Sequence, residues 1–341
     1  MKKIVLFGEL MLRLRPEGKE RLFQKPLLEA VFGGSEANVA VSLSCLGEKS
    51  VYVTALPDNA VAQAAKASLM HHGVEVKPVF REGRMGIYFL ESGACQRPSS
   101  VIYDREQSSV SLASPDEYDW KEIFCDADWF HLSGVTPAIS ENAALCSFRA
   151  IDEAKKAGCT VSLDLNYRKK LWKWGKRADE VMKLLAKKAD VLIANEEDIQ
   201  NCLGIPLENL SSPKESYKRL CEDVKSAFPE VSFVAVTLRK SYSADRNGWS
   251  AVMSGRHGFF ESVHYDIENI VERVGAGDSF AAGLIYALRR NESSEKGEEA
   301  ALAFAAAASC LKHSIPGDFN LSSKAEIESL MMGNGNGRIL R

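Results

Sequence analysis

A glycine-rich turn that carries an acidic residue is the segment of this sequence best suited to chemistry. It reads Gly275-Ala276-Gly277-Asp278, and apolar residues at helical spacing follow it. Glycines let a backbone approach a ligand closely, and the free amides and dipole at a helix start favour anions such as phosphate. A carboxylate beside a phosphate repels it, so Asp278 needs a compensating role. Accepting a proton from an attacking hydroxyl is such a role, which indicates phosphoryl transfer.

The same turn also has a purely structural interpretation. Asp278 could cap the helix while the glycines form a tight turn, and the residues of the turn alone do not decide between the two. The turn is not a dinucleotide fingerprint, because Phe280 stands where a third glycine is needed. The sequence also contains no GxxxxGK[ST] phosphate loop.

The elements that must position this turn alternate between strands and helices. Continuous apolar runs at Thr160–Leu163, Val191–Ala194 and Phe233–Val236 each adjoin an amphipathic helix. Uninterrupted apolar strands are typical of a parallel sheet buried on both faces, and repeated βα units are typical of doubly wound folds. We therefore expect an α/β fold with a parallel-rich central sheet flanked by helices.

Two segments, residues 11–33 and 85–112, break this rhythm. They alternate polar and apolar residues and lack helical stripes, which predicts strands of a small, half-exposed sheet. We expect them to form one β lid over a core made of residues 1–10, 34–84 and 113–330. The exposed edges of such a lid favour a homodimer through the lid. Residues 331–341 contain repeated Gly and Asn and are expected to form a flexible tail.

The overall composition argues against several classes of partner. The 341 residues carry 43 Lys and Arg and 46 Asp and Glu, so the net charge is −3 and gives no long-range attraction to nucleic acid or an anionic membrane. No apolar stretch approaches the length of a membrane span. The eight cysteines form no CxxC pair, and we interpret them as free thiols of a cytoplasmic protein.

Two motifs together resemble the signatures of the ribokinase-like (PfkB-type) carbohydrate kinases. Gly275-Ala276-Gly277-Asp278 followed by Ser-Phe-x-x-Gly resembles the C-terminal signature, and Gly33-Gly34-Ser35-Glu36-Ala37-Asn38 resembles the N-terminal one. The resemblance extends from Gly8 to about Asp318. It implies a Rossmann-like core with a β lid, ATP and Mg²⁺ as cofactors, and phosphorylation of a sugar hydroxyl.

The resemblance also implies roles for single residues. Asp278 is expected to be the catalytic base, with Gly275, Ala276 and Gly277 forming the anion hole for the transferred phosphoryl group. Gly34 and Asn38 are expected to contact sugar hydroxyls. Tyr88 and Tyr103 suit a half-wet sugar contact, although both could be lid core.

A second group of residues is expected at the nucleotide. Asn195-Glu196-Glu197-Asp198 resembles the family's Asn-x-x-Glu motif, so Asn195 and Asp198 are expected to hold magnesium through water. Asp198 is one methylene shorter than the family's Glu. Thr237 and Arg239 follow a predicted strand where the family places nucleotide contacts, although Arg239 could equally be a solvated surface charge.

The sequence departs from the family just before the anion hole. Many members have Asp-Thr there and bind a monovalent cation, whereas this chain has Glu272-Arg273. A fixed guanidinium near the loop could replace the charge of the cation. We therefore expect no strong potassium activation.

Within the family, several strings resemble 2-keto-3-deoxygluconate kinases, among them Tyr103-Asp104-Arg105 and Asp164-Leu165-Asn166-Tyr167-Arg168. Arg13, Arg105 and Arg168 fall in motifs expected to ring the sugar. Guanidinium groups bind a carboxylate in planar, bidentate geometry, which favours a sugar acid as substrate. Arg13 could instead face solvent, and Arg168 could bind nucleotide phosphate.

Three hypotheses remain open at this stage. The first is an ATP-dependent kinase for the terminal hydroxyl of a sugar acid such as 2-keto-3-deoxygluconate. The second is a fructokinase or another kinase for a neutral sugar. The third is a non-catalytic sugar sensor on a kinase fold, against which the retention of Asp278 and both glycines argues.

Overall fold

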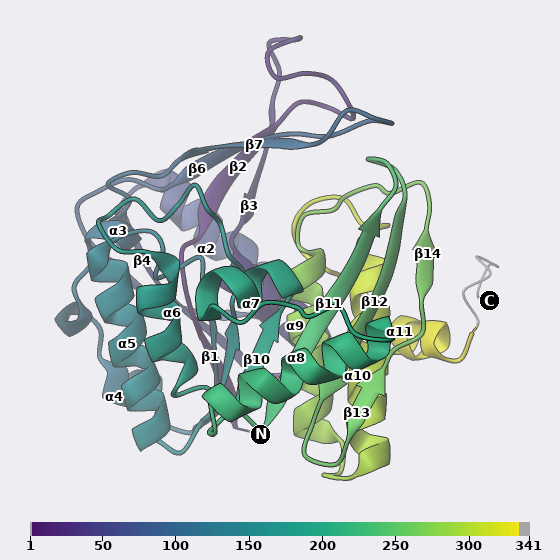
Figure 1. Ribbon diagram of the computed structural model, residues 1–341. Coiled ribbons are helices and arrows are strands. Elements are labelled where there is room, and N and C mark those ends of the chain that lie inside the picture. Colours follow the sequence, from purple (N-terminus) through teal and green to yellow (C-terminus); the bar gives the residue numbers. More distant parts are fainter. Residues whose placement is uncertain (1, 334–341) are drawn as a thin grey trace.

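The computed structural model describes residues 2–333, and its central feature is a large sheet with helices on both faces (Figure 1). Seven adjacent strands are parallel, and three antiparallel strands extend one edge. This confirms the predicted α/β fold with a parallel-rich sheet. In spatial order the strands are β13 (Phe259–Glu261), β12 (Asn247–Ser254), β11 (Phe233–Ser241), β10 (Val191–Ala194), β9 (Thr160–Asp164), β8 (Ala127–Ser133), β1 (Lys3–Phe7), β4 (Ser50–Leu56) and β5 (Glu75–Phe80), with β14 (Tyr265–Ile267) also paired to β12.

The helices divide between the two faces of the sheet because each face has its own apolar core. Strands β1, β4 and β10 are buried along their whole length, as continuous apolar strands between two helical layers must be. One core contains side chains of α1 (Ser35–Cys45), α2 (Ala60–His71), α9 (Ala276–Arg290), α10 (Glu295–Lys312) and α11 (Lys324–Met331). The other contains side chains of α3 (Ser109–Leu112), α4 (Trp120–Ile123), α5 (Glu141–Lys156), α6 (Ala178–Ala186), α7 (Glu196–Leu203) and α8 (Pro213–Ala227); the short 3₁₀ helix η1 (Pro115–Glu117) precedes α4.

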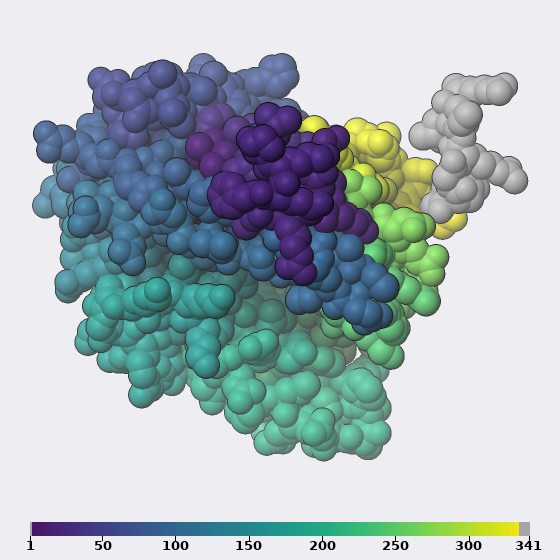
Figure 2. All heavy atoms as spheres, turned by 90° about the horizontal axis from the view of Figure 1, so that it is seen from above, coloured from purple at the N-terminus to yellow at the C-terminus, as the bar shows by residue number. Residues whose placement is uncertain are grey.

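A separate sheet of four strands forms the lid. Its order is β3 (Glu29–Gly33), β2 (Met11–Arg15), β6 (Ile87–Glu91) and β7 (Ser100–Asp104), and all four strands lie within residues 11–33 and 85–112. Figure 2, which looks down on the lid, shows the N-terminal segment lying across the junction between the earlier and later parts of the chain. Helix α3 ends the second segment, but it contacts β4 and α5 of the core.

The C-terminal end of the described chain is helical. Helix α11 extends to Met331, so the first residue of the predicted tail belongs to a helix. Residues 334–341 of that predicted tail lie outside the described residues. None of the described helices combines the length and apolar character that crossing a membrane requires.

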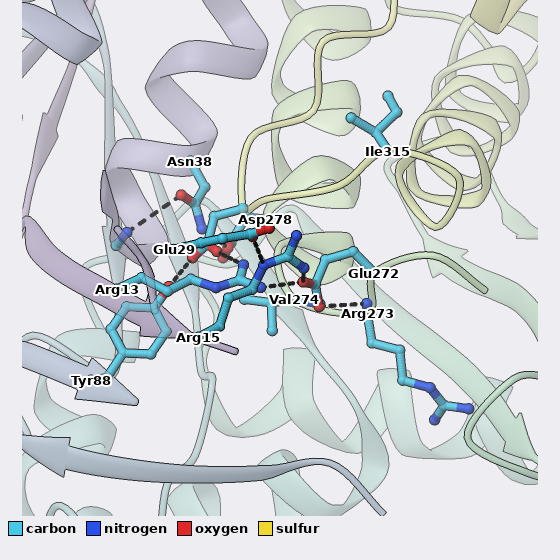
Figure 3. A network of polar contacts seen from close by, with 12 residues as sticks. Arg13, Arg15, Glu29, Asn38, Tyr88, Glu272, Arg273, Val274, Asp278 and Ile315 are labelled. Atoms are coloured by element: carbon cyan, nitrogen blue, oxygen red, sulfur yellow. Dashed lines mark hydrogen bonds and ion pairs between the residues drawn. The ribbon is translucent and has the colours of Figure 1, made fainter. Parts of the chain in front are cut away.

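A buried arginine joins the lid to the core. Arg13 of β2 forms ion pairs with Glu272 and Asp318, which lie in the loops before α9 and after α10 (Figure 3). Tyr88 of β6 donates a hydrogen bond to Asp318 as well. The expectations that Arg13 contacts sugar or faces solvent are therefore both wrong, since its side chain is fully buried and its charge is matched by carboxylates of the core.

Replacing Arg13 should destabilise the protein strongly, because Glu272 and Asp318 would remain buried without the guanidinium that pairs with both of them. We expect Arg13→Leu to lower the free energy of unfolding by about 3–5 kcal/mol. Arg84→Leu is the matched control, since Arg84 pairs with Asp104 on the lid surface and such pairs contribute only about 0–1 kcal/mol. Urea unfolding of both variants measures the difference, and equal losses would contradict a lid held by the buried ion pairs.

Candidate active site

A pocket of about 600 Å³ lies where the lid faces the carboxyl ends of β9 and β10. Such a position is where open α/β sheets bind their ligands. The structure brings together in this pocket the site residues that the separate sequence motifs predict. Those residues are Gly34, Asn38, Tyr88, Tyr103, Arg105, Arg168, Asn195, Asp198, Thr237, Arg239, Gly275, Ala276, Gly277 and Asp278.

The carboxylate of Asp278 is held by side chains from the start of α1. Ser35 Oγ donates to Oδ1 at 2.7 Å, and Asn38 Nδ2 donates to Oδ2 at 2.7 Å. The N-cap of α9 is Gly275, so the structural interpretation of Asp278 as a helix cap is wrong. Burial raises the pKa of Asp278 to about 6, although the two hydrogen bonds lower it.

The two glycines of the turn serve different physical needs. Gly275 has a φ of 84°, and a Cβ there would lie 2.1 Å from the backbone oxygen of Asp318. Gly275 is therefore required by the backbone itself. A Cβ at Gly277 would meet no atom within 4 Å, so this position faces open space beside the first amides of α9. These amides have no acceptor inside the helix and can bind an anion.

Two further acids, Asp164 and Asp198, line the pocket. Asp164 ends β9, and burial together with the charges of Asp198 and Asp278 raises its pKa well above the usual range. Asp198 is also buried, which raises its pKa to about 6, and its Oδ1 accepts a hydrogen bond from Tyr167 N at 3.1 Å. The side-chain oxygen of Asn195 accepts from Asp198 N at 2.8 Å and so caps α7. Within residues 2–333, no three His, Cys, Asp or Glu side chains form a ready-made metal site.

The arginines of the pocket differ in whether a carboxylate of the protein already pairs with them. Arg105 Nε donates to Glu9 Oε2 at 2.7 Å, and Arg105 Nη2 donates to the same oxygen. Arg105 Nη1 is buried and has no hydrogen-bond partner among the described residues. Arg168 is exposed, and the partner of its Nη1 is the backbone oxygen of Tyr167 at 3.0 Å.

The nucleotide-side residues Thr237 and Arg239 lie inside β11, which continues to Ser241, and so do not follow the strand as the sequence predicted. Thr237 Oγ1 donates to Ala194 O at 3.3 Å, which joins β11 to the end of β10. Arg239 is exposed at the pocket rim. Trp249 and His313, which the sequence analysis did not assign to the site, also line the pocket with ring centroids 5.8 Å apart.

Comparisons with known proteins agree with this geometry. The model of the pfkB family carbohydrate kinases matches residues 1–320. The chain belongs to this family. Its structure is similar to that of a 2-dehydro-3-deoxygluconokinase from Thermotoga maritima, with 44% identity, a TM-score of 0.91, and 98% of this chain and 100% of that chain covered.

The names of two curated relatives refer to different sugars. A 2-dehydro-3-deoxygalactonokinase from Haloferax volcanii is 33% identical over 98% of this chain and 98% of the relative. A probable fructokinase-3 from Arabidopsis thaliana is 28% identical over 85% of this chain and 79% of the relative.

In this carbohydrate kinase, Glu272 and Arg273 are adjacent in sequence but bind different partners. Glu272 binds Arg13, and its Oε1 accepts from the backbone nitrogens of Arg273 and Val274 at 3.0 and 3.2 Å. The Arg273 guanidinium extends away from this group (Figure 3) and donates to the carbonyl oxygens of Ser243 and Ala244. Its charge therefore does not lie behind the anion-binding turn, contrary to the expectation that it replaces a cation there.

Several groups of the kinase site escaped the sequence predictions. Ser35 and Asp164 stood in motifs, but only the folded chain shows that Ser35 donates to Asp278 and that the charge of Asp278 helps to raise the pKa of Asp164. An acid directly after a predicted buried strand, as at Asp164, is the signal that could have found one of them. No local pattern reveals the partners of Glu9 and Asp318, because Arg105 and Arg13 lie 96 and 305 residues away.

Proposed function

We propose that this carbohydrate kinase transfers the γ-phosphoryl group of ATP to the terminal hydroxyl of a sugar acid. The favoured substrate is 2-keto-3-deoxygluconate, which would be converted to its 6-phosphate. The observation that carries this proposal is Arg105 Nη1, a buried guanidinium nitrogen without a partner among the described residues, on a side chain that lines the same pocket as Asp278. Because that nitrogen has almost no accessible surface, a substrate carboxylate would satisfy it through a shift of the Arg105 side chain toward the pocket.

The charge of the pocket supports a sugar acid over a neutral sugar as substrate, although fewer arginines contribute to it than the sequence predicted. Arg13 is excluded by its burial with Glu272 and Asp318, and Arg105 already shares its charge with Glu9. Arg168 is the exposed guanidinium that can complete a clamp with Arg105. The similarity to sugar-acid kinases from Thermotoga maritima and Haloferax volcanii points in the same direction.

The proposed reaction assigns one step to each part of the site. Asp278 accepts the proton of the sugar hydroxyl as the oxygen attacks the γ-phosphorus, and the bond between that phosphorus and the bridging oxygen of ADP breaks. The first amides of α9, at Gly277 and Asp278, stabilise the negative charge on the transferred group. Ala276 N makes a long contact of 3.4 Å to Arg273 O and is the weaker donor of the turn.

The residues near α7 fit a magnesium ion held mainly by phosphates and water. Mg²⁺ prefers one or two carboxylates and keeps several waters, and Asp198 with Glu197 supplies carboxylates on the pocket wall. The side-chain oxygen of Asn195 already caps α7, so we propose that its contact to the ion runs through water. Bound there, the ion would neutralise charge on the phosphates of ATP.

We also propose that the protein works in the cytoplasm as a homodimer joined through its lids. All eight cysteines are free, which suits a reducing compartment. Phe23, Leu27 and Ile102 are large apolar side chains exposed on the lid, and β3 and β7 are the edge strands of its sheet. A second copy would cover both the apolar side chains and a strand edge.

The substrate proposal predicts a strong preference for the acid. We expect kcat/KM for 2-keto-3-deoxygluconate to exceed that for fructose by roughly ten- to a hundredfold for each charged contact. Arg168→Gln and Arg105→Gln should narrow the gap between the two substrates. Arg84→Gln, on the lid surface, should change neither value. A wild-type preference for fructose would overturn the acid and favour the fructokinase alternative.

One further variant separates recognition of the acid from damage to the lid. Arg105→Gln leaves Glu9 unpaired beside the substrate, so the double variant Glu9→Gln/Arg105→Gln removes that extra repulsion. We expect the double variant still to show the narrowed gap. Equal losses on both substrates in the double variant would mean that Arg105 organises the lid instead of binding the carboxylate.

The assignment of Asp278 as the base predicts an acidic limb in the pH profile. Because the pKa of Asp278 is about 6, its carboxylate becomes protonated as the pH falls through that value and can no longer accept the substrate proton. We expect kcat/KM to fall by about tenfold per pH unit below pH 6 and to be level above about pH 7. A profile that stays level down to pH 5 would contradict the assignment.

Asp278→Asn is the control that assigns this limb. It should reduce turnover by at least about a hundredfold and abolish the acidic limb, while sugar and nucleotide binding remain. Asp198 has a similar pKa. If the Asp278→Asn enzyme kept both its turnover and the acidic limb, the limb would have to be assigned to Asp198.

The lid-mediated dimer is tested by charge placed on the lid. Phe23→Glu and Ile102→Glu should shift sedimentation velocity from dimer to monomer, because each buries a charge at the proposed contact. Val263→Glu is the control, since Val263 is equally exposed but lies in the β13–β14 loop. A wild-type protein that is monomeric at every concentration would reject the dimer.

A further inference from the structure

Lys312, in the last turn of α10, is a fully buried lysine that the proposed reaction does not use. Its Nζ donates to Ile315 O at 3.0 Å, in the turn that follows the helix. Burial lowers its pKa to about 8, while Glu272 and Asp318 raise it, so the side chain remains protonated at neutral pH. A buried ammonium is costly unless opposite charges surround it, so its neighbours explain its presence.

Lys312 belongs to a buried group of charged side chains. Arg13 and Lys312 are each 0% exposed, and Glu272 and Asp318 are 5% and 4% exposed. Arg13 pairs with both carboxylates, and the electrostatic influence of both also reaches Lys312. Arg15, whose Nη1 lies 3.5 Å from Glu272 Oε2, adds a partly buried cation at the outer edge of the group. Removing Lys312 would take one of the two fully buried cations away from Glu272, Asp318 and Asp278, all of which lie within its electrostatic reach.

This charge group lies directly behind the anion-binding turn. A Cβ at Gly275 would lie 3.2 Å from Lys312 Cε and 2.1 Å from Asp318 O. Ser309 Oγ, on the preceding turn of α10, donates to Ala276 O at 2.7 Å. Val271 N donates to His313 O at 2.9 Å, which joins the loop before α9 to the loop after α10. Lys312 therefore supports the back of the same backbone whose amides face the pocket.

We propose that Lys312 is a positioning residue whose ammonium is the internal cation of the anion-binding turn. It neutralises Glu272 and Asp318 behind Gly275, and its charge adds to the dipole of α9 in favouring the transferred phosphoryl group. Phosphoryl transfer by this chain is therefore independent of added monovalent cations. The inference rests on the proposed role of residues 275–277 as the phosphoryl-binding turn.

The wild-type enzyme gives the first test. Its kcat should agree within about twofold in potassium chloride, sodium chloride and tetramethylammonium chloride at equal ionic strength, because screening is then the same in each. Saturable activation of the wild type by potassium would overturn the proposal, whatever the variants do.

Two replacements of Lys312 separate its charge from its volume. Lys312→Met fills the space without charge and should lower kcat by roughly ten- to a hundredfold, as expected for a lost charged contact, with KM for the sugar little changed. Lys312→Ala leaves room, so ammonium or potassium should restore kcat saturably, while tetramethylammonium is too large to do so. Lys312→Met should not respond to any of these ions, because its side chain fills the site.

Lys225→Ala is the matched control for this rescue. Lys225 is half-buried and, like Lys312, donates to a backbone oxygen, that of Gly255, at 2.6 Å, but it belongs to α8 and is not among the residues around Gly275. Its variant should show no response of kcat to the cation. A folded Lys312→Met enzyme with wild-type kcat, or equal rescue of Lys312→Ala by potassium and tetramethylammonium, would reject the internal cation.

Failure of this inference is distinct from failure of the proposed reaction. If Lys312→Ala does not fold, the wild-type cation series and Lys312→Met still decide the matter. If Asp278→Asn retains turnover, the proposed base is wrong even when the wild type ignores potassium. A potassium-dependent wild type with an inactive Asp278→Asn variant would reject Lys312 alone.

Discussion

Asp278 is presented by the first turn of α9, and Ser35 and Asn38 at the start of α1 hold its two oxygens. A carboxylate this deeply buried keeps its charge only where donors face it, and here the donors lie more than 200 residues away in the chain. The contact therefore requires two helices to begin side by side. Helices α1 and α9 pack against each other on the same face of the sheet, which places both glycine-containing turns beside one pocket. The large sheet and its two apolar cores provide that alignment.

The same arrangement explains what the sequence predicts well. The apolar runs of β9, β10 and β11 identify buried parallel strands, and the residues that follow such strands must meet at one edge of the sheet. Asp164 and Asn195, at the ends of β9 and β10, reach the pocket in this way, whereas Thr237 reaches it from within β11. The glycine pairs identify the two helix starts through local backbone chemistry. All of these predictions depend on short-range patterns and on one general rule of α/β folds.

Charge partners follow no such local pattern. Arg13, Arg105 and Arg168 look alike in the sequence, yet one is enclosed by core carboxylates, one is tied to Glu9, and one is exposed. Arg13 lies on the buried, inner face of the lid, where neither of its two sequence interpretations placed it. The sequence pattern of β2 cannot reveal that Glu272 and Asp318 pair with Arg13, because these residues come from loops near the other end of the chain. The unfilled hydrogen-bonding capacity of Arg105, and not the number of arginines, is the feature that favours an acidic substrate.

The two ends of the lid are linked to Glu272 and Arg273, the adjacent residues of the loop before α9. At the base of the lid, Glu272 binds Arg13. At its tip, Cys95 O accepts from Ala244 N at 2.7 Å, and the Arg273 guanidinium donates to Ala244 O. Adjacent residues of one loop thus contact both ends of the lid, directly or through a single intermediate residue. Any movement of the lid must change the surroundings of Glu272 or Arg273, and both precede the turn that faces the phosphoryl group. The position of the lid and the shape of the anion-binding turn are therefore linked through this loop, and Lys312 lies against the inner side of that turn.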